Sequence, residues 1–213
     1  MVSRLLSHGY DVVVWNRSPQ SVEQLREGLS AKQKKHLSSV SSISEFSKLS
    51  APRIIWSMLP AGVATDHALK EVSLFVQKGD IVIDGGNAHF KDTQKRFEIF
   101  QQQGIRFLGV GVSGGIHAEK NGYAMMIGGD KSAYDELQPV FQTLAKPSAN
   151  FDYFGTGGAG HFVKMVHNAI EYGMMQAIGE GFGILEKSSY DMDLVKVANT
   201  WTKGTIVSSF LID

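Results

Sequence analysis

Residues 80–112, DIVIDGGNAHFKDTQKRFEIFQQQGIRFLGVGV, contain two apolar runs separated by a longer stretch. The runs at 80–84 and 105–112 are short, apolar and bounded by glycine and asparagine, a pattern typical of buried strands. Residues 91–103, between them, have the spacing of apolar residues that is typical of a helix. A strand, a helix and a second strand in this order predict a βαβ unit with parallel strands.

The same alternation extends toward the N-terminus. Apolar runs at 11–15 (DVVVW) and 53–59 (RIIWSML) predict further buried strands, and residues 64–77 have helical spacing. Residues 28–50 are rich in serine and lysine, and we expect them to hold a short strand and a short helix. Together these elements predict an α/β fold of the Rossmann type with a doubly wound, mainly parallel sheet.

The alternation ends near residue 157. Helical patterns follow, through residue 187 and again from 191 to about 202. We therefore predict two domains, a dinucleotide-binding domain at 1–157 and the start of an all-helical domain at 158–213.

A sheet of this type normally opens with a strand and a G-x-G-x-x-G loop that holds the pyrophosphate of a dinucleotide. The chain instead begins MVSRLLSHGYDVVVWNR, which has the pattern of the helix and second strand that follow such a loop. We therefore expect the chain to be a fragment without its first strand and phosphate loop. The strands of such a sheet lie in the order 3-2-1-4-5-6, so the loss of strand 1 leaves a gap in the middle.

Composition limits the classes of function. Lysine plus arginine (21) equals aspartate plus glutamate (21), so no overall charge attracts nucleic acid or an anionic membrane surface. The chain has no cysteine, which excludes disulfides, thiolate metal sites and cysteine nucleophiles. No apolar run approaches the ~20 residues of a membrane span, and no histidines or carboxylates have metal-ligand spacing. We expect a small-molecule ligand, without metal, nucleic acid or membrane.

Residues 158–176, GAGHFVKMVHNAIEYGMMQ, place unusual polar chemistry on a glycine-rich helix. At 100° per residue, an arc of about 100° contains Lys164, His167, Asn168 and Glu171. The opposite side predicts a packing stripe made of Val163, Val166, Ile170, Gly173 and Ala177. A solvated polar face and a buried one both fit this arc. The glycines favour close packing, and a buried polar face must be satisfied by a ligand or by internal partners.

Three loops carry further candidate groups. Ser113–Gly115 can offer a hydroxyl and open backbone N–H groups to an anion such as a carboxylate. Asp84–Asn87 stands at the carboxyl end of a strand, where open α/β sheets place their ligands. Arg17 ends another strand at the position that reads the adenosine ribose, and its guanidinium favours the 2′-phosphate of NADP. The alternatives are plain glycine turns and a solvated arginine.

These residues together resemble decarboxylating 6-phosphogluconate dehydrogenase, especially its shorter members, within the wider group of β-hydroxyacid dehydrogenases. The resemblance covers nearly the whole chain. It rests on NRS (16–18), MLPAG (58–62), DGGN (84–87), VSGG (112–115) with the following NGYAMMIGGD, and above all GAGHFVKMVHNAIEYGMMQ.

The resemblance implies NADP-dependent oxidative decarboxylation of 6-phosphogluconate to ribulose 5-phosphate and CO₂ in the pentose phosphate pathway, with NAD as the alternative cofactor. It makes Lys164 the general base and Glu171 the acid, and it needs no metal. The residues implied to bind substrate are Asn87, Ser113, Gly114, Gly115, His167, Asn168 and Tyr172. Those implied to bind cofactor are Asn16, Arg17, Ser18, Leu59, Pro60, Ala61 and Asn87.

By the same resemblance we expect a cytoplasmic homodimer or larger homo-oligomer, with 158–213 beginning the domain for substrate binding and dimerisation. One alternative is a β-hydroxyacid dehydrogenase that does not decarboxylate, against which His167, Glu171 and Tyr172 argue. Another is a catalytically silent binding protein, which the missing glycine loop favours. Because most of the helical domain is also missing, we expect residues 1–213 alone to turn over no 6-phosphogluconate.

Overall fold

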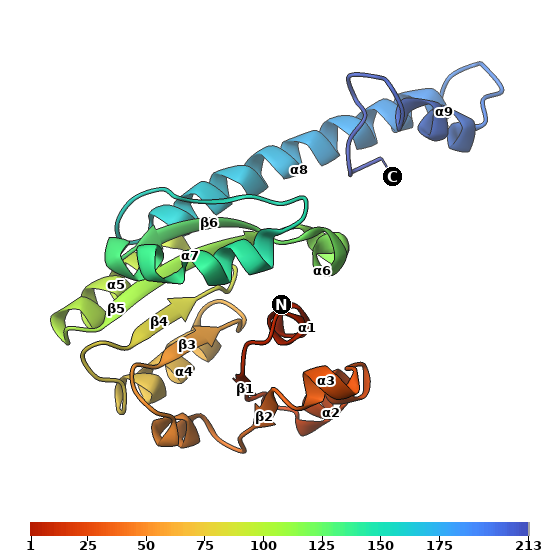
Figure 1. The fold of residues 1–213 in the computed structure, drawn as a ribbon. Coiled ribbons are helices and arrows are strands. Elements are labelled where there is room, and N and C mark those ends of the chain that lie inside the picture. The colour runs from red at the N-terminus through yellow and green to blue at the C-terminus, as the bar shows by residue number, and fades with distance from the viewer. Residues whose placement is uncertain (213) are drawn as a thin grey trace. The chain divides into compact units, whose positions relative to one another are not determined.

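The computed structural model describes residues 1–212, and their contacts divide the chain into two compact units, Met1–Met165 and Val166–Asp213. All the described strands belong to the first unit. The long helix α8 (Ala159–Glu186) begins in the first unit and continues into the second (Figure 1).

The larger sheet of the first unit has the strand order β3-β4-β5-β6-β7. The strands are β3 (Ile54–Ser57), β4 (Ile81–Asp84), β5 (Arg106–Ser113), β6 (Ala124–Gly129) and β7 (Phe151–Tyr153). The first three are parallel, and their register places Ser57 opposite Asp84 and Asp84 opposite Gly109. β6 is antiparallel to β5, and β7 is parallel to β6. The sheet is therefore mainly parallel, as predicted.

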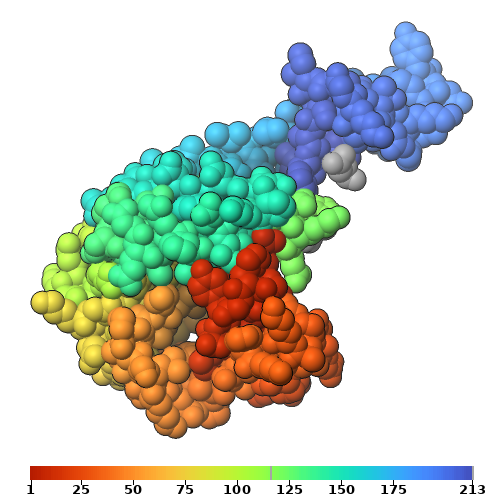
Figure 2. Space-filling model, viewed as in Figure 1, coloured from red at the N-terminus to blue at the C-terminus, as the bar shows by residue number. Residues whose placement is uncertain are grey.

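A second sheet contains only the parallel strands β1 (Val12–Val14) and β2 (Leu37–Ser39). No strand pairing joins it to the larger sheet within residues 1–212, so β1, β2 and β3 each have one edge without a strand partner. Figure 2 shows an opening between the N-terminal segment and the residues around 40–60. The break falls where the sequence predicts a gap in the middle of the sheet.

Helices cover both faces of the larger sheet (Figure 1). Along β4, Val82 packs with the residues of α4 and α5, whereas its neighbour Ile83 packs with those of α7. Successive strand residues point to opposite faces, so a strand covered on both sides must be apolar throughout. This explains the continuous run IVI and confirms the doubly wound arrangement.

The helices of the first unit follow the predicted pattern with additions. Residues 28–50 form a short strand and short helices, and the predicted helices at 64–77 and 91–103 correspond to α4 and α5. α7 was not foreseen; its N-cap Asp130 accepts a hydrogen bond from Ala133 N at 3.0 Å. The helical segments preceding α8 are α1 (Val2–Ser7), α2 (Pro19–Glu27), α3 (Ala31–Lys34), η1 (Ile43–Lys48), α4 (Val63–Ser73), α5 (Phe90–Gln102), η2 (Gly115–His117), α6 (Ala118–Asn121) and α7 (Lys131–Ala145).

The second unit consists of the later part of α8 and of α9 (Leu194–Trp201), as the helical patterns predict. The rings of Phe182 and Trp201 meet edge to face with centroids 5.5 Å apart. No residue from 166 to 212 is fully buried. None of the described helices combines the length and apolar character that a membrane span requires.

Candidate functional site

The start of α8 lies directly on the backbone of β5 and β6. A Cβ added to Gly160 would come within 2.5 Å of the carbonyl oxygen of Gly109 and within 2.6 Å of the nitrogen of Gly128. A Cβ on Gly128 would in turn lie 2.4 Å from the nitrogen of Gly160. These contacts leave no room for a side chain. The glycines therefore allow the helix to approach the sheet to backbone contact.

Lys164 follows on the same helix and is only 8% exposed. A Cβ added to Gly111 of β5 would lie 2.3 Å from its Cβ and 2.9 Å from its Cγ, so the stem of the lysine lies across the strand. Of the predicted polar arc, this side chain is the one that is buried. Burial is a common way in which proteins prepare a lysine to act as a base.

The Gly85–Gly86 turn after β4 lies against the segment that follows β3. A Cβ on Gly86 would be 2.5 Å from the carbonyl oxygen of Leu59, and a Cβ on Gly85 would be 2.3 Å from Nε1 of Trp56. Two of the stretches predicted to bind cofactor are thus in contact. Asn87, the next residue of the turn, is exposed at this edge of the sheet.

An ion-pair network that is buried at Asp84 and Arg96 and exposed at Asp66 supports this turn. Asp84 is fully buried, and its Oδ2 accepts a hydrogen bond from Nη1 of Arg96 at 2.7 Å. Its Oδ1 accepts from Gly86 N at 3.2 Å. Arg96 also donates from Nε and Nη2 to Oδ1 of Asp66, at 3.0 and 2.6 Å. This arginine of α5 therefore connects the turn after β4 with the first turn of α4, and sequence reasoning did not identify it.

His161 is a second buried group that sequence reasoning considered only as a metal ligand. It is 1% exposed, and its Nδ1 lies 2.7 Å from Oγ1 of Thr93. Its Nε2 is buried without a hydrogen-bond partner in the described chain. Burial lowers the pKa of His161, although the nearby carboxylate of Asp84 acts in the opposite direction. The described residues hold no cluster of metal-ligating side chains.

The other predicted residues of α8 belong to the second unit. Nδ1 of His167 is 3.2 Å from Oδ1 of Asn168 and 3.7 Å from Oε2 of Glu171. The side chains of His167 and Glu171 are each 41% exposed, and Tyr172 is 66% exposed. The structure therefore brings His167, Asn168 and Glu171 together on one side of the helix.

The predicted packing stripe is wrong for part of its length. Val166 and Ile170 are 42% and 60% exposed, and the polar residues opposite them are also partly exposed. Within the second unit there are too few elements to cover α8 on every side. The expectation of a buried polar face therefore holds at Lys164 and fails beyond it.

The predicted cofactor residues at the end of β1 are exposed. Oδ1 of Asn16 accepts a hydrogen bond from Ser18 N at 3.1 Å, which shapes the turn before α2. Arg17, between them, is exposed. In the loop before α4, the carbonyl oxygen of Pro60 accepts from Oγ1 of Thr65 at 2.7 Å, which fixes the loop carrying Leu59 and Ala61.

The predicted anion-binding turn after β5 needs its glycines. Gly114 and Gly115 have φ angles of 122° and 53°, in a region that residues with a side chain rarely adopt. A Cβ on Gly114 would also lie 2.7 Å from Cβ of Ala118. Ser113, the last residue of β5, is partly buried.

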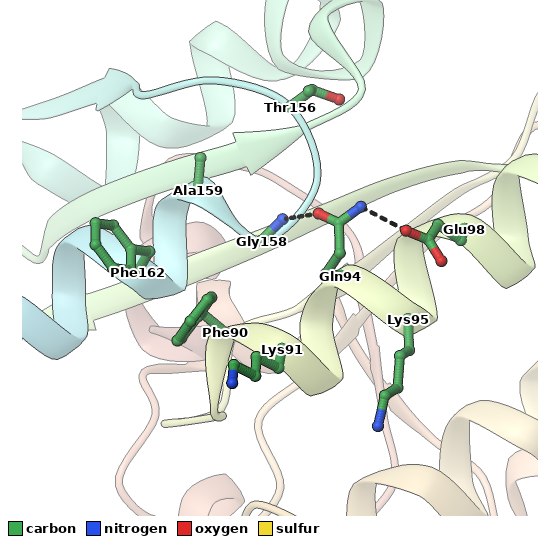
Figure 3. A pocket seen from close by; sticks show the side chains of 9 residues that line it. All are labelled: Phe90, Lys91, Gln94, Lys95, Glu98, Thr156, Gly158, Ala159 and Phe162. Carbon is green, nitrogen blue, oxygen red and sulfur yellow. Dashed lines mark hydrogen bonds between the residues drawn. The ribbon is translucent and has the colours of Figure 1, made fainter.

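A cleft of about 480 Å³ lies where α5 and the start of α8 meet. Figure 3 shows the side chains that line it. None of the predicted catalytic or binding residues lines it. The lining residues are Phe90, Lys91, Gln94, Lys95, Glu98, Thr156, Gly158, Ala159 and Phe162.

The fold and these loops are those of a Rossmann-type dinucleotide-binding protein. Residues 1–157 match the family described as the NAD binding domain of 6-phosphogluconate dehydrogenase, and residues 160–213 match the 6-phosphogluconate dehydrogenase C-terminal domain. The chain belongs to the 6-phosphogluconate dehydrogenase family, which confirms the resemblance inferred from its motifs.

Individual relatives agree. The NAD(+)-dependent, decarboxylating 6-phosphogluconate dehydrogenase of Haloferax volcanii is 37% identical over all of this chain and 68% of its own length. The decarboxylating enzyme of Candida albicans is 38% identical over all of this chain and 42% of its own. The Plasmodium falciparum 6-phosphogluconate dehydrogenase, solved alone and with NADP⁺ or 6-phosphogluconate, has a TM-score of 0.85 at 34% identity, over 99% of this chain and 46% of that one. The chain thus spans 42% to 68% of the length of these proteins.

Proposed function

We propose that the protein catalyses the oxidative decarboxylation of 6-phosphogluconate to ribulose 5-phosphate and CO₂, with NADP as the preferred cofactor. The observation that carries this proposal is the burial of Lys164 across Gly111 of β5. A buried lysine at the start of a helix that also carries His167, Asn168 and Glu171 fits a base that acts on a sugar hydroxyl. The relatives named above support the choice of substrate.

In the first step, Nζ of Lys164 takes the proton of the 3-hydroxyl while a hydride leaves C3, so that C3 becomes a ketone. The nicotinamide cofactor, when bound, supplies the acceptor for that hydride. The resulting β-keto acid loses CO₂, because the ketone can hold the electron pair of the broken C–C bond as an enediolate. Glu171 then protonates the carbon that lost CO₂, which is C2 of the substrate and becomes C1 of ribulose 5-phosphate.

The chain's own residues fit a dinucleotide at the carboxyl ends of its strands. The contact between Gly86 and the carbonyl of Leu59 brings two cofactor-binding loops together, and Arg17 is exposed at the end of β1. Asn16, Ser18, Pro60, Ala61 and Asn87 complete the proposed cofactor set. The guanidinium of Arg17 favours the 2′-phosphate of NADP over the free hydroxyl of NAD.

For the substrate, we propose that Ser113, Gly114 and Gly115 hold the carboxylate, while His167 and Asn168 hold the hydroxyls. Tyr172 would bind the phosphate. We also infer a cytoplasmic homo-oligomer. Exposed apolar residues in the second unit, such as Ile170 and Ile184, support assembly, and the absence of cysteine fits a reducing compartment.

The test is to express the chain with any coding sequence that adjoins it, and to measure NADPH absorbance and CO₂ release with 6-phosphogluconate. Lys164→Ala should abolish NADPH formation while substrate still binds, because only the base is lost. Glu171→Gln should slow ketose release more than NADPH formation in a single turnover. NADPH formation without CO₂ would instead indicate a β-hydroxyacid dehydrogenase that does not decarboxylate, and full activity of Lys164→Ala would reject the proposal.

A further inference from the structure

The start of α8 is fixed to α5 by buried contacts that the proposed mechanism does not use. Oγ1 of Thr93 lies 2.7 Å from Nδ1 of His161, and Thr93 is fully buried. On the next residue of α5, Oε1 of Gln94 accepts a hydrogen bond from Gly158 N at 3.0 Å (Figure 3). Two neighbouring side chains of α5 therefore hold Gly158, which directly precedes α8, and His161, in the first turn of the helix.

An aromatic contact reinforces the same junction. The rings of Phe90 and Phe162 meet edge to face with centroids 5.2 Å apart, and Figure 3 shows the two side chains next to each other. A Cβ on Gly158 would lie 2.4 Å from the carbonyl oxygen of Phe90, so the two backbones are also in contact there. The start of α8 thus has little freedom to slide along α5.

His161 also reaches the sheet. A Cβ on Gly109 of β5 would lie 3.1 Å from its Nδ1, and the backbone of Gly86 and of Val110 interacts with its ring. The imidazole therefore contacts α5, lies against β5 and is close to the turn after β4. Each of these elements carries or adjoins a residue of the proposed site.

Lys164 lies three residues after His161 on the helix, and its contact Gly111 lies two residues after Gly109 on the strand. Residues three apart on a helix are neighbours on its surface. A helix held at His161 is therefore also held at Lys164.

We propose that His161 is a positioning residue for Lys164: its imidazole, held by the hydroxyl of Thr93, fixes the rotation and height of the first turns of α8 on β5, and so sets where the lysine amine lies. This inference rests on the proposed role of Lys164 as the base. Neither His161 nor Thr93 takes a chemical part in the reaction.

The decisive variants change Thr93, because valine keeps its shape and removes only the hydroxyl. We expect Thr93→Val to lower kcat with 6-phosphogluconate by about tenfold to a hundredfold, since small displacements of a catalytic group have effects of this size. KM should change much less, and Thr93→Ser should restore kcat. The matched control is Thr143→Val on α7, where the lost hydroxyl bonds only to the Pro139 carbonyl of the same helix.

A measurement without substrate separates this inference from the proposed function. Acetic anhydride labelling, followed by mass spectrometry, reports how accessible the amine of Lys164 is. We expect Thr93→Val and His161→Leu to raise its labelling rate several-fold, whereas His161→Gln, which keeps a hydrogen-bonding group, should raise it less. Lys196, whose side chain is 84% exposed, serves as the internal standard.

The outcomes are distinct. Unchanged kcat and unchanged Lys164 labelling in a folded Thr93→Val protein would overturn the inference, and so would an equal loss in Thr93→Ser. If Thr93→Val does not fold, the comparison of His161→Gln with His161→Leu decides in the same way. If labelling shifts as expected but the protein expressed with its adjoining coding sequence does not oxidise 6-phosphogluconate, the positioning role stands and the proposed function fails.

Discussion

Gly111 has no side chain, and Lys164 occupies the space that a side chain at this position would need. We expect Gly111→Ala to destabilise the fold by about 1–3 kcal/mol, the usual effect of overpacking, because its Cβ would lie 2.3 Å from Cβ of Lys164. Urea unfolding would measure this. Gly28→Ala is the matched control, since Gly28 has a φ of −72° and its nearest neighbour would be 3.7 Å away. Equal stability of the two variants would contradict the close contact.

Arg17 tests cofactor preference. We expect Arg17→Ala to weaken NADP binding by about 1.5–3 kcal/mol, the range for a hydrogen bond to a charged group, and to leave NAD binding nearly unchanged. Calorimetric titration with each cofactor would measure both affinities. Arg26→Ala, on the following helix, is the control for a general loss of positive charge. An unchanged ratio of NADP to NAD affinity would show that the 2′-phosphate is read elsewhere.

Among single residues, the sequence predicted site groups that lie close together in one short segment. It missed groups whose partners are far away in the sequence and are brought near only by the fold. The helical period placed Lys164 on a polar arc, and its burial follows from the glycines around it. His161 and Thr93 lie 68 positions apart, and Arg96 reaches Asp66 from 30 positions away. Nothing in the local pattern of either helix indicates such partners, because they are set by how α5 and α8 pack.

Asp80 connects secondary-structure elements and is not one of the proposed ligand-binding residues. Its carboxylate accepts hydrogen bonds from Arg53 N at 2.6 Å, Gln77 N at 3.0 Å and Nη1 of Arg53 at 3.0 Å. It therefore connects the starts of β3 and β4 with the segment between α4 and β4. Burial alone would raise the pKa of Asp80, but these hydrogen bonds outweigh it and hold the pKa below its usual value.

A lowered pKa means that the ionised form stabilises the fold above about pH 4, and that this stability is lost as pH falls through the folded pKa. We expect Asp80→Asn to reduce the free energy of unfolding by about 3–5 kcal/mol at neutral pH, because Arg53 keeps a charge without its partner. The loss should shrink at acid pH. Asp135→Asn, in an exposed pair with Lys131, should change stability little. Similar pH profiles of unfolding for the two variants would contradict this account.

Among the elements, the sequence predicted the strands rich in valine and isoleucine and the short strand within 28–50, but missed β6 and β7. β6 has the sequence AMMIGG with one β-branched residue, and β7 has only three residues. Their place is set by backbone contact: Gly128 and Gly160 let α8 pack on β6. The helix predicted to 77 ends at Ser73 instead, because Phe75 and Val76 pack into the core beside α4.

At the scale of the whole molecule, the two units differ in how much they bury. The first contains three buried apolar clusters, whereas no residue from 166 to 212 is fully buried. Backbone amides exchange with solvent more readily where few apolar contacts must be broken. We expect the amides of β4 and β5 to exchange slowest and those of α9 fastest, as measured by hydrogen–deuterium exchange. Equal protection of α9 and β5 would show that the second unit is covered by other molecules in solution.

The packing of Trp56 has an optical consequence. Its indole Nε1 is buried without a hydrogen-bond partner in the described chain, its ring meets Phe141 edge to face, and it lies against Gly85. An indole in such apolar surroundings emits at short wavelength, and any ligand that moves the Gly85 turn must alter that emission. Replacing the two other tryptophans, Trp15 and Trp201, by phenylalanine would leave Trp56, at the carboxyl edge of the sheet, as the single tryptophan. Selective excitation of Trp56 would then report any ligand that moves the Gly85 turn, without an attached dye.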